Sequence, residues 1–578
     1  MSSGDEAGPT PLEASLDLDV SAERLTLGSF LEDITSRYTE RTALVSGTQR
    51  WSYAQLGDET RRVAKALLAC GVTKGTRVAV LMGNSPELAA TLFAVGMVGG
   101  VAVPMSTFAA PPERDHVLAH CDAALAVLES SLASNTYLAD LARDHPEVVG
   151  APPGAIRSVT FPFLRRVVAL GDPEGRLEGW EEFLGLGEDV EEGLVDAAAA
   201  TVVPYDDAVM IYTSGTTALP KSVLHTHRSV TGQLWRWGAQ VKLTVEDRVW
   251  SSFPFFWSAG FAMVLGGTLA CGATLYVDEV FDAGSVLELM ERERMTTYYA
   301  FPHTDALLAD HPDAQRRDLT SLKNLRTASA LFKFTGREAK ESSWDVSAGY
   351  GSSETFTVST ALPNDAPLSL RLSSHGLPLA GMRIRIADTE TGAPLAPGES
   401  GEITVKGVYL MRGYYKMAPE ASLDDEGWFH TQDAGHLDEQ GYLHWHGRIS
   451  GMIKTGGSNV SPVEVETRAF ESGVLGVVAV VGVPHPLLGE AVVMCAVPLH
   501  GTEPDRAVVL AHLKETLAVY KVPRRILFFS DDELGFTASD KVQADLVRQL
   551  AVERLVATDE DRDWVAYLKS LEPQASGS

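Results

Sequence analysis

The stretch 207-DAVMIYTSGTTALPK-221 joins an apolar segment to a loop of small polar residues that ends in a lysine. Asp207–Tyr212 has the short apolar run of a buried strand. The loop offers consecutive backbone N–H groups, hydroxyl donors and one positive charge, from Thr213, Ser214, Gly215, Thr216, Thr217 and Lys221. Such a loop can hold a polyphosphate. A Ser- and Thr-rich surface turn has a similar composition, and the loop lacks the GxxxxGK[ST] pattern of ordinary P-loop enzymes.

Outward from this stretch, strands and helices alternate. A strand is predicted at Arg41–Ser46, and Ser52 with Gln55 forms a capping box for a helix that ends at Gly71. Further predicted elements are a helix at 86–95 and strands at 77–82, 101–103, 273–277, 296–299, 324–328 and 346–348. This alternation indicates largely parallel sheet covered by helices. The less regular residues 130–200 are expected to form an insertion or surface excursion.

The pattern changes near Gly401, where 402–406 and 442–446 are β-like, and again after Ser450, where helices and strands form a compact unit. We therefore predict an α/β protein with a large N-terminal domain of mixed or parallel sheets and flanking helices. The predicted divisions are a flexible tail at 1–25, the large domain at 26–449 with a β-rich subdomain at about 380–449, and a small mobile C-terminal α/β domain at 450–578.

Composition narrows the class of protein and its partners. The 578 residues include 48 Lys and Arg against 77 Asp and Glu, a net charge of −29, which disfavours a nucleic-acid partner. Four scattered cysteines without a CxxC pair, and an N-terminus without an apolar signal segment, favour a cytoplasmic protein.

Two uncharged runs, Leu88–Ala110 and Val249–Val277, are interrupted by Gly and Pro. We expect each to form a buried helix and strand instead of a membrane span.

Several motifs now support one resemblance. The segment TSGTTALPKSVLHTH resembles the signature of adenylate-forming enzymes, which include acyl-CoA synthetases, peptide-synthetase adenylation domains and luciferases. Further blocks resembling the family follow in its order: FPFFWSAG at 253–260, YGSSET at 350–355, GWFHTQDAG at 427–435, GRISGMIKTGGSNVSPVEVE at 447–466, YKVPR at 520–524 and TASDK at 537–541. The likeness covers about residues 30 to 550 and is nearest to acyl-CoA ligases.

The resemblance implies a reaction in two halves. A carboxylate first attacks the α-phosphate of ATP, giving acyl-AMP and pyrophosphate, and a thiol, usually that of CoA, then displaces AMP. The small domain is expected to rotate between the halves about a hinge near Ser450. The implied cofactor is Mg²⁺, with ATP and CoA as co-substrates.

The resemblance also assigns residues. The catalytic residues would be Lys541, Glu354 and Thr217, of which Glu354 and Thr217 would hold the metal. Phosphate and AMP would contact Thr213, Ser214, Gly215, Thr216, Lys221, Ser329, Ala330, Tyr350, Gly351, Ser353, Asp433 and Arg448. Phe256, Trp257 and Gly351 would line the acyl pocket, with Trp257 as an aromatic gate. Gly456, Gly457, Tyr520 and Arg524 would line the CoA channel.

The chain departs from the family pattern at five places, one of which is the hinge position, where Ser450 stands in place of the usual Asp or Lys. Ala218 and Ser222 stand where the phosphate loop usually has Gly, Gln432 replaces the Gly of TGD, and Asp540 replaces the Gly before the lysine. Because Ala218, Ser222 and Asp540 affect mainly the ATP half, one hypothesis is that adenylation is weakened or lost. The enzyme would then convert acyl-AMP supplied by a companion adenylating ligase. Ordinary family variation in a complete two-step ligase is the interpretation we favour.

Other functions stay open. A separate carrier protein could replace CoA as acceptor, and a silent acyl or nucleotide binder is an alternative of another class. The aromatic block and its uncharged neighbours predict a hydrophobic carboxylic acid as the small-molecule substrate, which could be fatty, aryl or a polycyclic terpenoid or steroid. The H-x-H pairs His225/His227 and His444/His446 are expected to be structural. The sequence does not predict the oligomeric state.

Overall fold

The computed structural model describes residues 25–213, 220–326, 329–337, 343–344, 349–363, 366–418, 420, 422–455, 458–499, 506–517, 519–530, 533–534, 544–558 and 561–571. Contacts divide the chain into two compact units. The first contains the chain up to Ile384 and Val405–Phe429, and the second contains Arg385–Thr404 and the chain from His430 onward. The α/β class is therefore confirmed, while the predicted domain boundaries stay a prediction.

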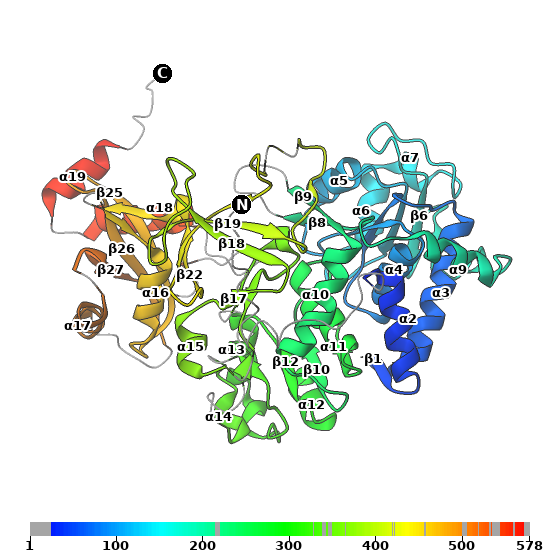
Figure 1. Cartoon of the computed structure of the whole chain (residues 1–578), viewed down its shortest axis with the longest axis horizontal. Helices are drawn as coiled ribbons and strands as arrows, with labels where there is room; N and C mark the ends of the chain where they lie inside the picture. The colour runs from blue at the N-terminus through cyan, green and yellow to red at the C-terminus, as the bar shows by residue number, and fades with distance from the viewer. Residues whose placement is uncertain are drawn as a thin grey trace, which may run out of the picture. The chain divides into compact units, whose positions relative to one another are not determined.

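The largest sheet of the first unit has eight strands in the order β20-β9-β8-β4-β3-β5-β6-β7. Its strands β6, β8 and β9 are labelled in Figure 1. Its strands are β3 (Arg77–Leu81), β4 (Val101–Pro104), β5 (Leu125–Glu129), β6 (Arg166–Leu170), β7 (Glu178–Gly179), β8 (Asp207–Thr213), β9 (Lys221–Thr226) and β20 (Gly413–Tyr414). The run from β7 to β8 is parallel, whereas β9 pairs antiparallel with both β8 and β20. The expected surface excursion at 130–200 was wrong in part, because β6 and β7 extend this sheet.

A second sheet has the order β12-β10-β11-β1-β2 and is parallel except for its β1–β2 edge. Its strands are β1 (Thr42–Ser46), β2 (Gln49–Ser52), β10 (Arg248–Ser251), β11 (Thr274–Val277) and β12 (Thr297–Tyr299). Small sheets of β13 (Leu325–Arg326) with β14 (Ser343–Trp344), and of β15 (Gly349–Tyr350), β16 (Thr360–Ala361) and β17 (Leu377–Pro378), complete the unit. The predicted strand at 346–348 lies outside the described residues.

The helices of the first unit are α2 (Leu27–Tyr38), α3 (Tyr53–Ala69), α4 (Pro86–Met97), α5 (Pro111–His120), α6 (Tyr137–Asp144), α7 (Pro146–Val149), α8 (Trp180–Gly185), α9 (Glu192–Thr201), α10 (His227–Gln240), α11 (Gly267–Ala270), α12 (Ala283–Arg292), α13 (Pro302–Asp310), α14 (Phe332–Thr335) and α15 (Leu368–Ser373). Shorter or wider turns are the π-helix η2 (Gly260–Gly266) and the 3-10 helices η3 (Pro312–Gln315) and η5 (Ser353–Thr355). The predicted capping box is confirmed, because Gln55 N–H donates to Ser52 Oγ over 3.1 Å and Ser52 N–H donates back to Gln55 Oε1 over 2.8 Å.

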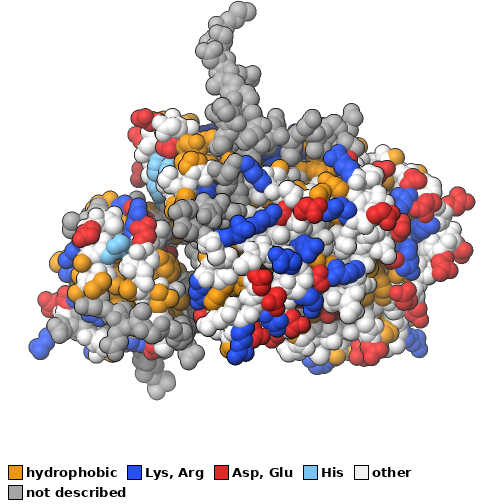
Figure 2. All heavy atoms as spheres, turned by 90° about the horizontal axis from the view of Figure 1, so that it is seen from below, with side chains coloured by type: hydrophobic (Ala, Val, Ile, Leu, Met, Phe, Trp, Pro, Cys, Tyr) orange, Lys and Arg blue, Asp and Glu red, His pale blue; other side chains and the backbone are white. Residues whose placement is uncertain are grey.

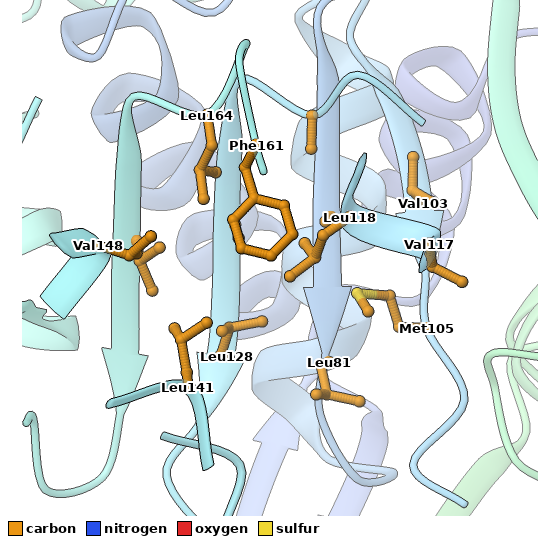
Figure 3. Packing of buried hydrophobic residues seen from close by; sticks show 14 of the residues in the cluster. Leu81, Val103, Met105, Val117, Leu118, Leu128, Leu141, Val148, Phe161 and Leu164 are labelled. Carbon is orange, nitrogen blue, oxygen red and sulfur yellow. The ribbon is translucent and has the colours of Figure 1, made fainter. Parts of the chain in front are cut away.

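The large sheet is held by a core of aliphatic and aromatic side chains. Leu81, Val103 and Leu128 point from its strands toward Leu118 of α5 and Leu141 of α6, as Figure 3 shows. These residues are almost fully buried. At roughly 25 cal/mol per Å² of apolar surface, such burial is the main stabilising contribution to the sheet.

Both uncharged runs form the predicted helix and strand. The first becomes α4 and β4, and the second becomes η2, α11 and β11. Among the described residues, we find no helix with the length and apolarity that a membrane crossing requires.

On the face shown in Figure 2, acidic and basic side chains lie interspersed.

The second unit contains a five-stranded sheet in the order β24-β23-β26-β25, with β27 paired to β26. Its elements are β23 (Ile453–Thr455), β24 (Ser458–Val460), α16 (Pro462–Phe470), β25 (Leu475–His485), β26 (Gly489–Pro498), α17 (Arg506–Thr516), η8 (Val519–Lys521), β27 (Arg525–Phe528), α18 (Ala544–Thr558) and α19 (Arg562–Ser570). A four-stranded sheet, β18-β19-β21-β22, comprises β18 (Met382–Ala387), β19 (Gly401–Gly407), β21 (Phe429–Leu437) and β22 (Leu443–Arg448), and the 3-10 helix η7 (Ile449–Gly451) follows it.

Candidate functional site

The predicted phosphate loop connects two antiparallel strands of the large sheet. Thr213 at the end of β8 pairs directly with Lys221 at the start of β9, so the two ends of the loop are adjacent. Ser214, Gly215, Thr216, Thr217 and Ala218 lie outside the described residues. Ser222 is paired opposite Tyr212 in the ladder, and an extended strand accepts a Cβ without strain. The Gly-to-Ser difference at this position therefore gives no structural reason for weaker phosphate binding.

The carboxylate predicted to hold magnesium is fixed from several sides. Glu354 lies in η5, where Ser352 Oγ accepts from its backbone N–H over 3.2 Å. Its carbonyl accepts from Met411 N–H over 2.7 Å, and its carboxylate Oε1 accepts from Tyr414 Oη over 2.8 Å. The preceding carbonyl, of Ser353, accepts from Nε2–H of His225 over 2.7 Å.

Tyr414 also contacts the lysine of the loop. The Nζ of Lys221 lies 5.4 Å from the centroid of the Tyr414 ring, within the range of a cation–π contact. The same tyrosine therefore contacts Lys221 and Glu354, two of the predicted ATP-site residues. Sequence reasoning missed Tyr414, because Gly413–Tyr414 lies between the quoted motifs. Its pairing with β9 can be read only from the structure.

The donor chemistry at Glu354 fits magnesium. Mg²⁺ takes oxygen ligands and is usually bound through one or two carboxylates together with substrate phosphates. A carboxylate has about four acceptor positions, so the bond from Tyr414 leaves room for a metal ion. Among the described residues, no group of three His, Cys, Asp or Glu side chains is arranged to hold a metal by itself.

Ser329 and Ala330 are organised by a residue that the sequence did not reveal. The carboxylate of Asp305, on α13, accepts from Ser329 Oγ over 2.7 Å and from Ala330 N–H over 2.9 Å. The hydroxyl of Tyr298 donates to the same carboxylate. Asp305 is 3% exposed, so this buried acid has three donors that compensate its desolvation. A lone Asp in a helix carries no sequence signal for such a role.

Tyr350 and Gly351 begin the loop that carries Glu354. Tyr350 is 7% exposed, and its carbonyl accepts from both the backbone N–H and the hydroxyl of Ser359, over 2.7 and 3.0 Å. A Cβ at Gly351 would lie 2.0 Å from the carbonyl oxygen of Thr357, which no side chain can tolerate. Gly351 thus allows the loop to fold back on itself, and this accounts for the glycine at that position.

The predicted acyl-pocket residues belong to an aromatic cluster. Phe256 and Trp257 have ring centroids 5.4 Å apart, and Trp257 also packs edge-on against Phe301 at 5.5 Å. Phe108 lies edge-on to both Phe256 and Trp257, at 5.5 and 6.1 Å. Phe108 is 55% exposed whereas Phe256 is 5% exposed, so Phe108 forms the solvent side of the cluster. Sequence reasoning missed Phe108 and Phe301 because neither lies within FPFFWSAG.

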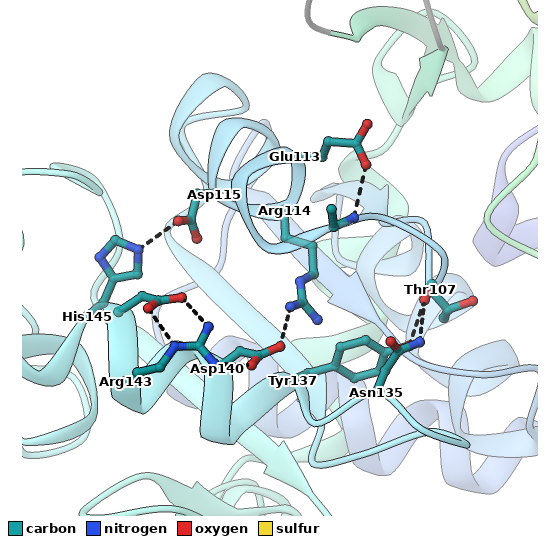
Figure 4. Close-up of polar contacts among 11 residues, drawn as sticks. Thr107, Glu113, Arg114, Asp115, Asn135, Tyr137, Asp140, Arg143 and His145 are labelled. Atoms are coloured by element: carbon teal, nitrogen blue, oxygen red, sulfur yellow. Dashed lines mark hydrogen bonds and ion pairs between the residues drawn. The ribbon is translucent and has the colours of Figure 1, made fainter. Parts of the chain in front are cut away.

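The loop that carries Phe108 is anchored at its base. The carbonyl of Thr107 accepts from Tyr137 Oη over 2.9 Å and from Asn135 Nδ2 over 3.2 Å, as Figure 4 shows. Arg114 supports this anchor, because its guanidinium lies 5.0 Å from the Tyr137 ring centroid and bonds Asp140 over 2.6 Å. The ring of Phe108 therefore projects from a fixed backbone.

The aromatic cluster and the Glu354 loop are joined in the first unit. The hydroxyl of Thr357 donates to the carbonyl of Ser258 over 3.2 Å. Ser258 directly follows Trp257, and Thr357 follows Glu354 by three residues. An apolar surface and an oxygen-rich loop are therefore attached to each other through one hydrogen bond.

The ribose residues lie in the second unit, where Asp433 and Arg448 are paired across β21 and β22. Nε of Arg448 lies 3.1 Å from Asp433 Oδ1, and its Nη1 donates to the Thr431 carbonyl over 2.7 Å. The Asp433 side chain is 7% exposed and that of Arg448 is 57% exposed. Arg448 therefore positions the buried carboxylate and still presents its own edge to solvent.

The remaining predicted residues also belong to the second unit. Ser450 lies in η7, directly after β22. Tyr520 is half exposed in η8, and Arg524 is exposed just before β27. Gly456, Gly457, Asp540 and Lys541 lie outside the described residues, so their predicted roles are not tested.

Comparison with known proteins is consistent with these features. The AMP-binding enzyme family matches residues 31–415, and the C-terminal domain of AMP-binding enzymes matches residues 464–541. The chain is 32% identical to a feruloyl-CoA synthase of an Amycolatopsis species over 511 residues, 88% of this chain and 95% of the relative. It is also 32% identical to an indoleacetate–CoA ligase of Aromatoleum aromaticum over 517 residues, 89% of this chain and 96% of the relative.

A solved structure of similar fold is that of the amide bond synthetase McbA from Marinactinospora thermotolerans. The TM-score is 0.71 at 26% identity, and the match covers 91% of this chain and 99% of that one.

Proposed function

The chain belongs to the family of AMP-binding enzymes and is an AMP-forming acid–thiol ligase, and on this premise we propose that it makes the CoA thioester of a hydrophobic acid through an acyl-adenylate. The observation that carries the proposal is the link between Thr357 and Ser258. It joins the loop that bears Glu354 to the aromatic cluster around Trp257. A substrate acid whose apolar part packs against these rings would therefore direct its carboxylate toward the predicted phosphate-binding residues.

In the first half-reaction, an oxygen of the substrate carboxylate forms a bond to the α-phosphorus of ATP. The bond from that phosphorus to the oxygen leading to the β-phosphate breaks, and pyrophosphate leaves. Lys221 and Lys541 would face the phosphate charge. Glu354 and Thr217 would hold Mg²⁺, which when bound offsets the charge of the triphosphate.

In the second half-reaction, the sulfur of CoA attacks the acyl carbon and AMP leaves as the acyl–phosphate bond breaks. Asp433 would bind the ribose hydroxyls, since an ionised carboxylate accepts several hydrogen bonds. Arg448 keeps that carboxylate in place. Gly456 and Gly457 would let the pantetheine arm pass close to the backbone, beside Tyr520 and Arg524.

The aromatic cluster favours an acid with a flat, apolar body. Phe108, Phe256 and Trp257 contact one another edge to face, with ring centroids 5.4 to 6.1 Å apart, and so form one aromatic surface against which a flat apolar body can pack. The names of two relatives, which refer to ferulate and indoleacetate, are in line with such a body. Fatty and polycyclic acids are the comparison compounds.

The four cysteines, all unpaired, support a reducing compartment such as the cytoplasm.

A paired half-reaction assay tests this function. One arm supplies acid, ATP and magnesium and measures pyrophosphate release, and the other supplies synthetic acyl-AMP with CoA and measures thioester. We expect both arms to proceed with an aryl acid. Glu354→Gln should lower pyrophosphate release about a hundredfold while thioester formation from acyl-AMP stays within a few fold. Absence of thioester in both arms would contradict the proposal.

The same assay separates the alternatives. Thioester from acyl-AMP without pyrophosphate release would identify an enzyme that depends on a companion adenylating ligase, and Ala218→Gly with Asp540→Gly should then restore release. A preference for a carrier-protein thiol over CoA would identify a carrier-loading enzyme. Because the solved neighbour McbA is named an amide bond synthetase, an amine acceptor belongs in the panel. Binding of acid and ATP without turnover would identify a silent binder.

A further inference from the structure

We propose that Tyr414 is a positioning residue for ATP, which keeps the carboxylate of Glu354 and the ammonium of Lys221 apart and aimed at different parts of the nucleotide. The inference rests on the proposed function. Its basis is one side chain with two contacts: Tyr414 Oη donates to Glu354 Oε1 over 2.8 Å, and its ring lies 5.4 Å from Lys221 Nζ.

Tyr414 prevents a competing ion pair. A lysine and a glutamate with no group between them attract each other, and the pair would neutralise both the cation meant for phosphate and the anion meant for metal. Among the ion pairs of the described residues, none joins Lys221 to Glu354. The ring occupies the position next to the ammonium, and the hydroxyl occupies one carboxylate oxygen.

The backbone holds Tyr414 firmly enough for this role. Tyr414 pairs with Val223 of β9, two residues from Lys221 on the neighbouring strand. The next residue, Tyr415, donates its backbone N–H to the Ser222 carbonyl over 2.9 Å. This backbone bond does not involve the Tyr415 hydroxyl, which donates to Asp122 over 2.8 Å. On the other side, Met411 N–H donates to the Glu354 carbonyl over 2.7 Å. Strand β20 is thus attached both to the hairpin and to the Glu354 loop.

The consequence is specific to the half-reaction that uses ATP. ATP carries the β- and γ-phosphates and their magnesium, whereas acyl-AMP has lost them. Loss of the Tyr414 hydroxyl should therefore weaken the binding of ATP with magnesium, so that a higher magnesium concentration is needed, and loss of the ring should weaken ATP binding further by freeing Lys221. Neither change should greatly affect thioester formation from preformed acyl-AMP.

The experiment compares Tyr414→Phe and Tyr414→Leu with Tyr415→Phe, a matched control whose lost hydroxyl contacts Asp122 instead. ATP binding is measured by calorimetry across a magnesium titration, and KM and kcat are measured in both half-reactions. For Tyr414→Phe we expect the half-maximal magnesium concentration to rise about tenfold, since a hydrogen bond to a charged group is lost. Tyr414→Leu should raise KM for ATP further, and Tyr415→Phe should match wild type.

Each outcome bears on one of the two claims. Unchanged magnesium dependence in Tyr414→Phe, an equal effect of Tyr415→Phe, or equal slowing of both half-reactions would overturn the role of Tyr414. A wild-type protein without magnesium-dependent ATP binding would overturn it as well. A wild-type protein that binds ATP with magnesium but makes no thioester would overturn the proposed function alone, and the binding comparison would still decide the role of Tyr414.

Discussion

Gln432 has a backbone conformation that suits glycine better than glutamine. Its φ is 60°, in the left-handed region, where a Cβ costs an L-residue about 1–2 kcal/mol. The resemblance puts a glycine at this position, between Thr431 and the ribose-binding Asp433. The strain is therefore stored one residue from a predicted ligand contact.

We expect Gln432→Gly to stabilise the second unit by roughly 0.5–1 kcal/mol, because relief of the left-handed strain exceeds the added freedom of the unfolded chain. Urea unfolding at neutral pH measures this change. Gln440→Gly, in the turn between β21 and β22, is the control, since Gln440 is not among the described residues with positive φ. Equal effects of the two substitutions would refute the argument.

Phe108 is a second residue whose role can be tested alone. Removal of its ring takes away the solvent side of the aromatic cluster, so Phe108→Ala should raise KM for a bulky aryl acid about tenfold, since the loss of an aromatic contact is worth about 1–2 kcal/mol. A small aliphatic acid should be affected less. Steady-state kinetics with both acids measure the ratio.

Phe163→Ala is the matched control, because Phe163 is 53% exposed, close to the 55% of Phe108, but belongs to another loop. It should leave both KM values unchanged. If Phe108→Ala changed the two acids equally, Phe108 would have no part in selecting the acyl group.

At the scale of an element, helix α16 carries a largely buried acid. Burial raises the pKa of Glu466 to about 7 from an ordinary value of 4.5, although Val480 N–H donates to its carboxylate over 2.8 Å. The folded state then holds a proton that the unfolded state releases, so stability is lost as pH rises from about 4.5 to about 7. The loss is roughly 3 kcal/mol for this shift.

Glu466→Gln should remove that pH dependence. The variant keeps an oxygen for the Val480 N–H and should exceed wild type by roughly 2–3 kcal/mol at pH 8, with little difference near pH 4.5. Denaturant unfolding across this range measures it. Glu464→Gln on the same helix loses only an ion pair with Lys521, 2.7 Å long, and should not gain stability at high pH.

Elements with strong local signals could be predicted from the sequence, and those that depend on distant partners could not. The capping box at Ser52 and the Gly-interrupted apolar runs are local, and they gave the observed α3, α4, β4 and β11. Strand β6 was missed because Arg166–Leu170 follows an irregular stretch, and only its pairing with β5 makes it part of the sheet.

The same distinction applies to the candidate site. Glu354, Asp433 and Arg448 stand in motifs, so their residue types and spacing indicated them. Tyr414, Asp305 and Phe108 act through partners 60, 24 and 148 residues away, so a single sequence offers no pattern for them. Side chains that support or complete a site through tertiary contact are the class that sequence reasoning failed to find.

At the scale of the whole molecule, two buried histidines contribute to the response of the first unit to acid. Burial lowers the pKa of His225 and of His227 to about 4, from an ordinary value of 6.5. Between pH 6.5 and 4, the two imidazoles are protonated in the unfolded chain but stay neutral in the folded state. The free energy of unfolding that is present above pH 6.5 is therefore lost as pH falls toward 4. Each histidine contributes roughly 3 kcal/mol to this loss at most.

We expect His227→Gln to flatten the acid limb of the stability profile, because its amide oxygen can accept from Leu27 N–H as His227 Nδ1 does over 3.2 Å, without titrating. Unfolding of the full chain by urea between pH 4 and 7 measures this. His512→Gln, on α17 of the second unit, should leave the acid limb unchanged. An acid limb of wild-type steepness in His227→Gln would show that this histidine is not responsible.

The second unit consists of two chain segments, Arg385–Thr404 and the chain from His430 onward. The shorter segment supplies partners to the ribose strand: the Ile403 carbonyl accepts from Thr431 Oγ1 over 2.7 Å, and Glu402 accepts from Gln432 N–H over 2.9 Å. A gene fragment cut at residue 430 or 450 would encode a polypeptide without these partners. Separate expression of this unit therefore requires residues 385–404 as well, for example joined to His430 through a short linker.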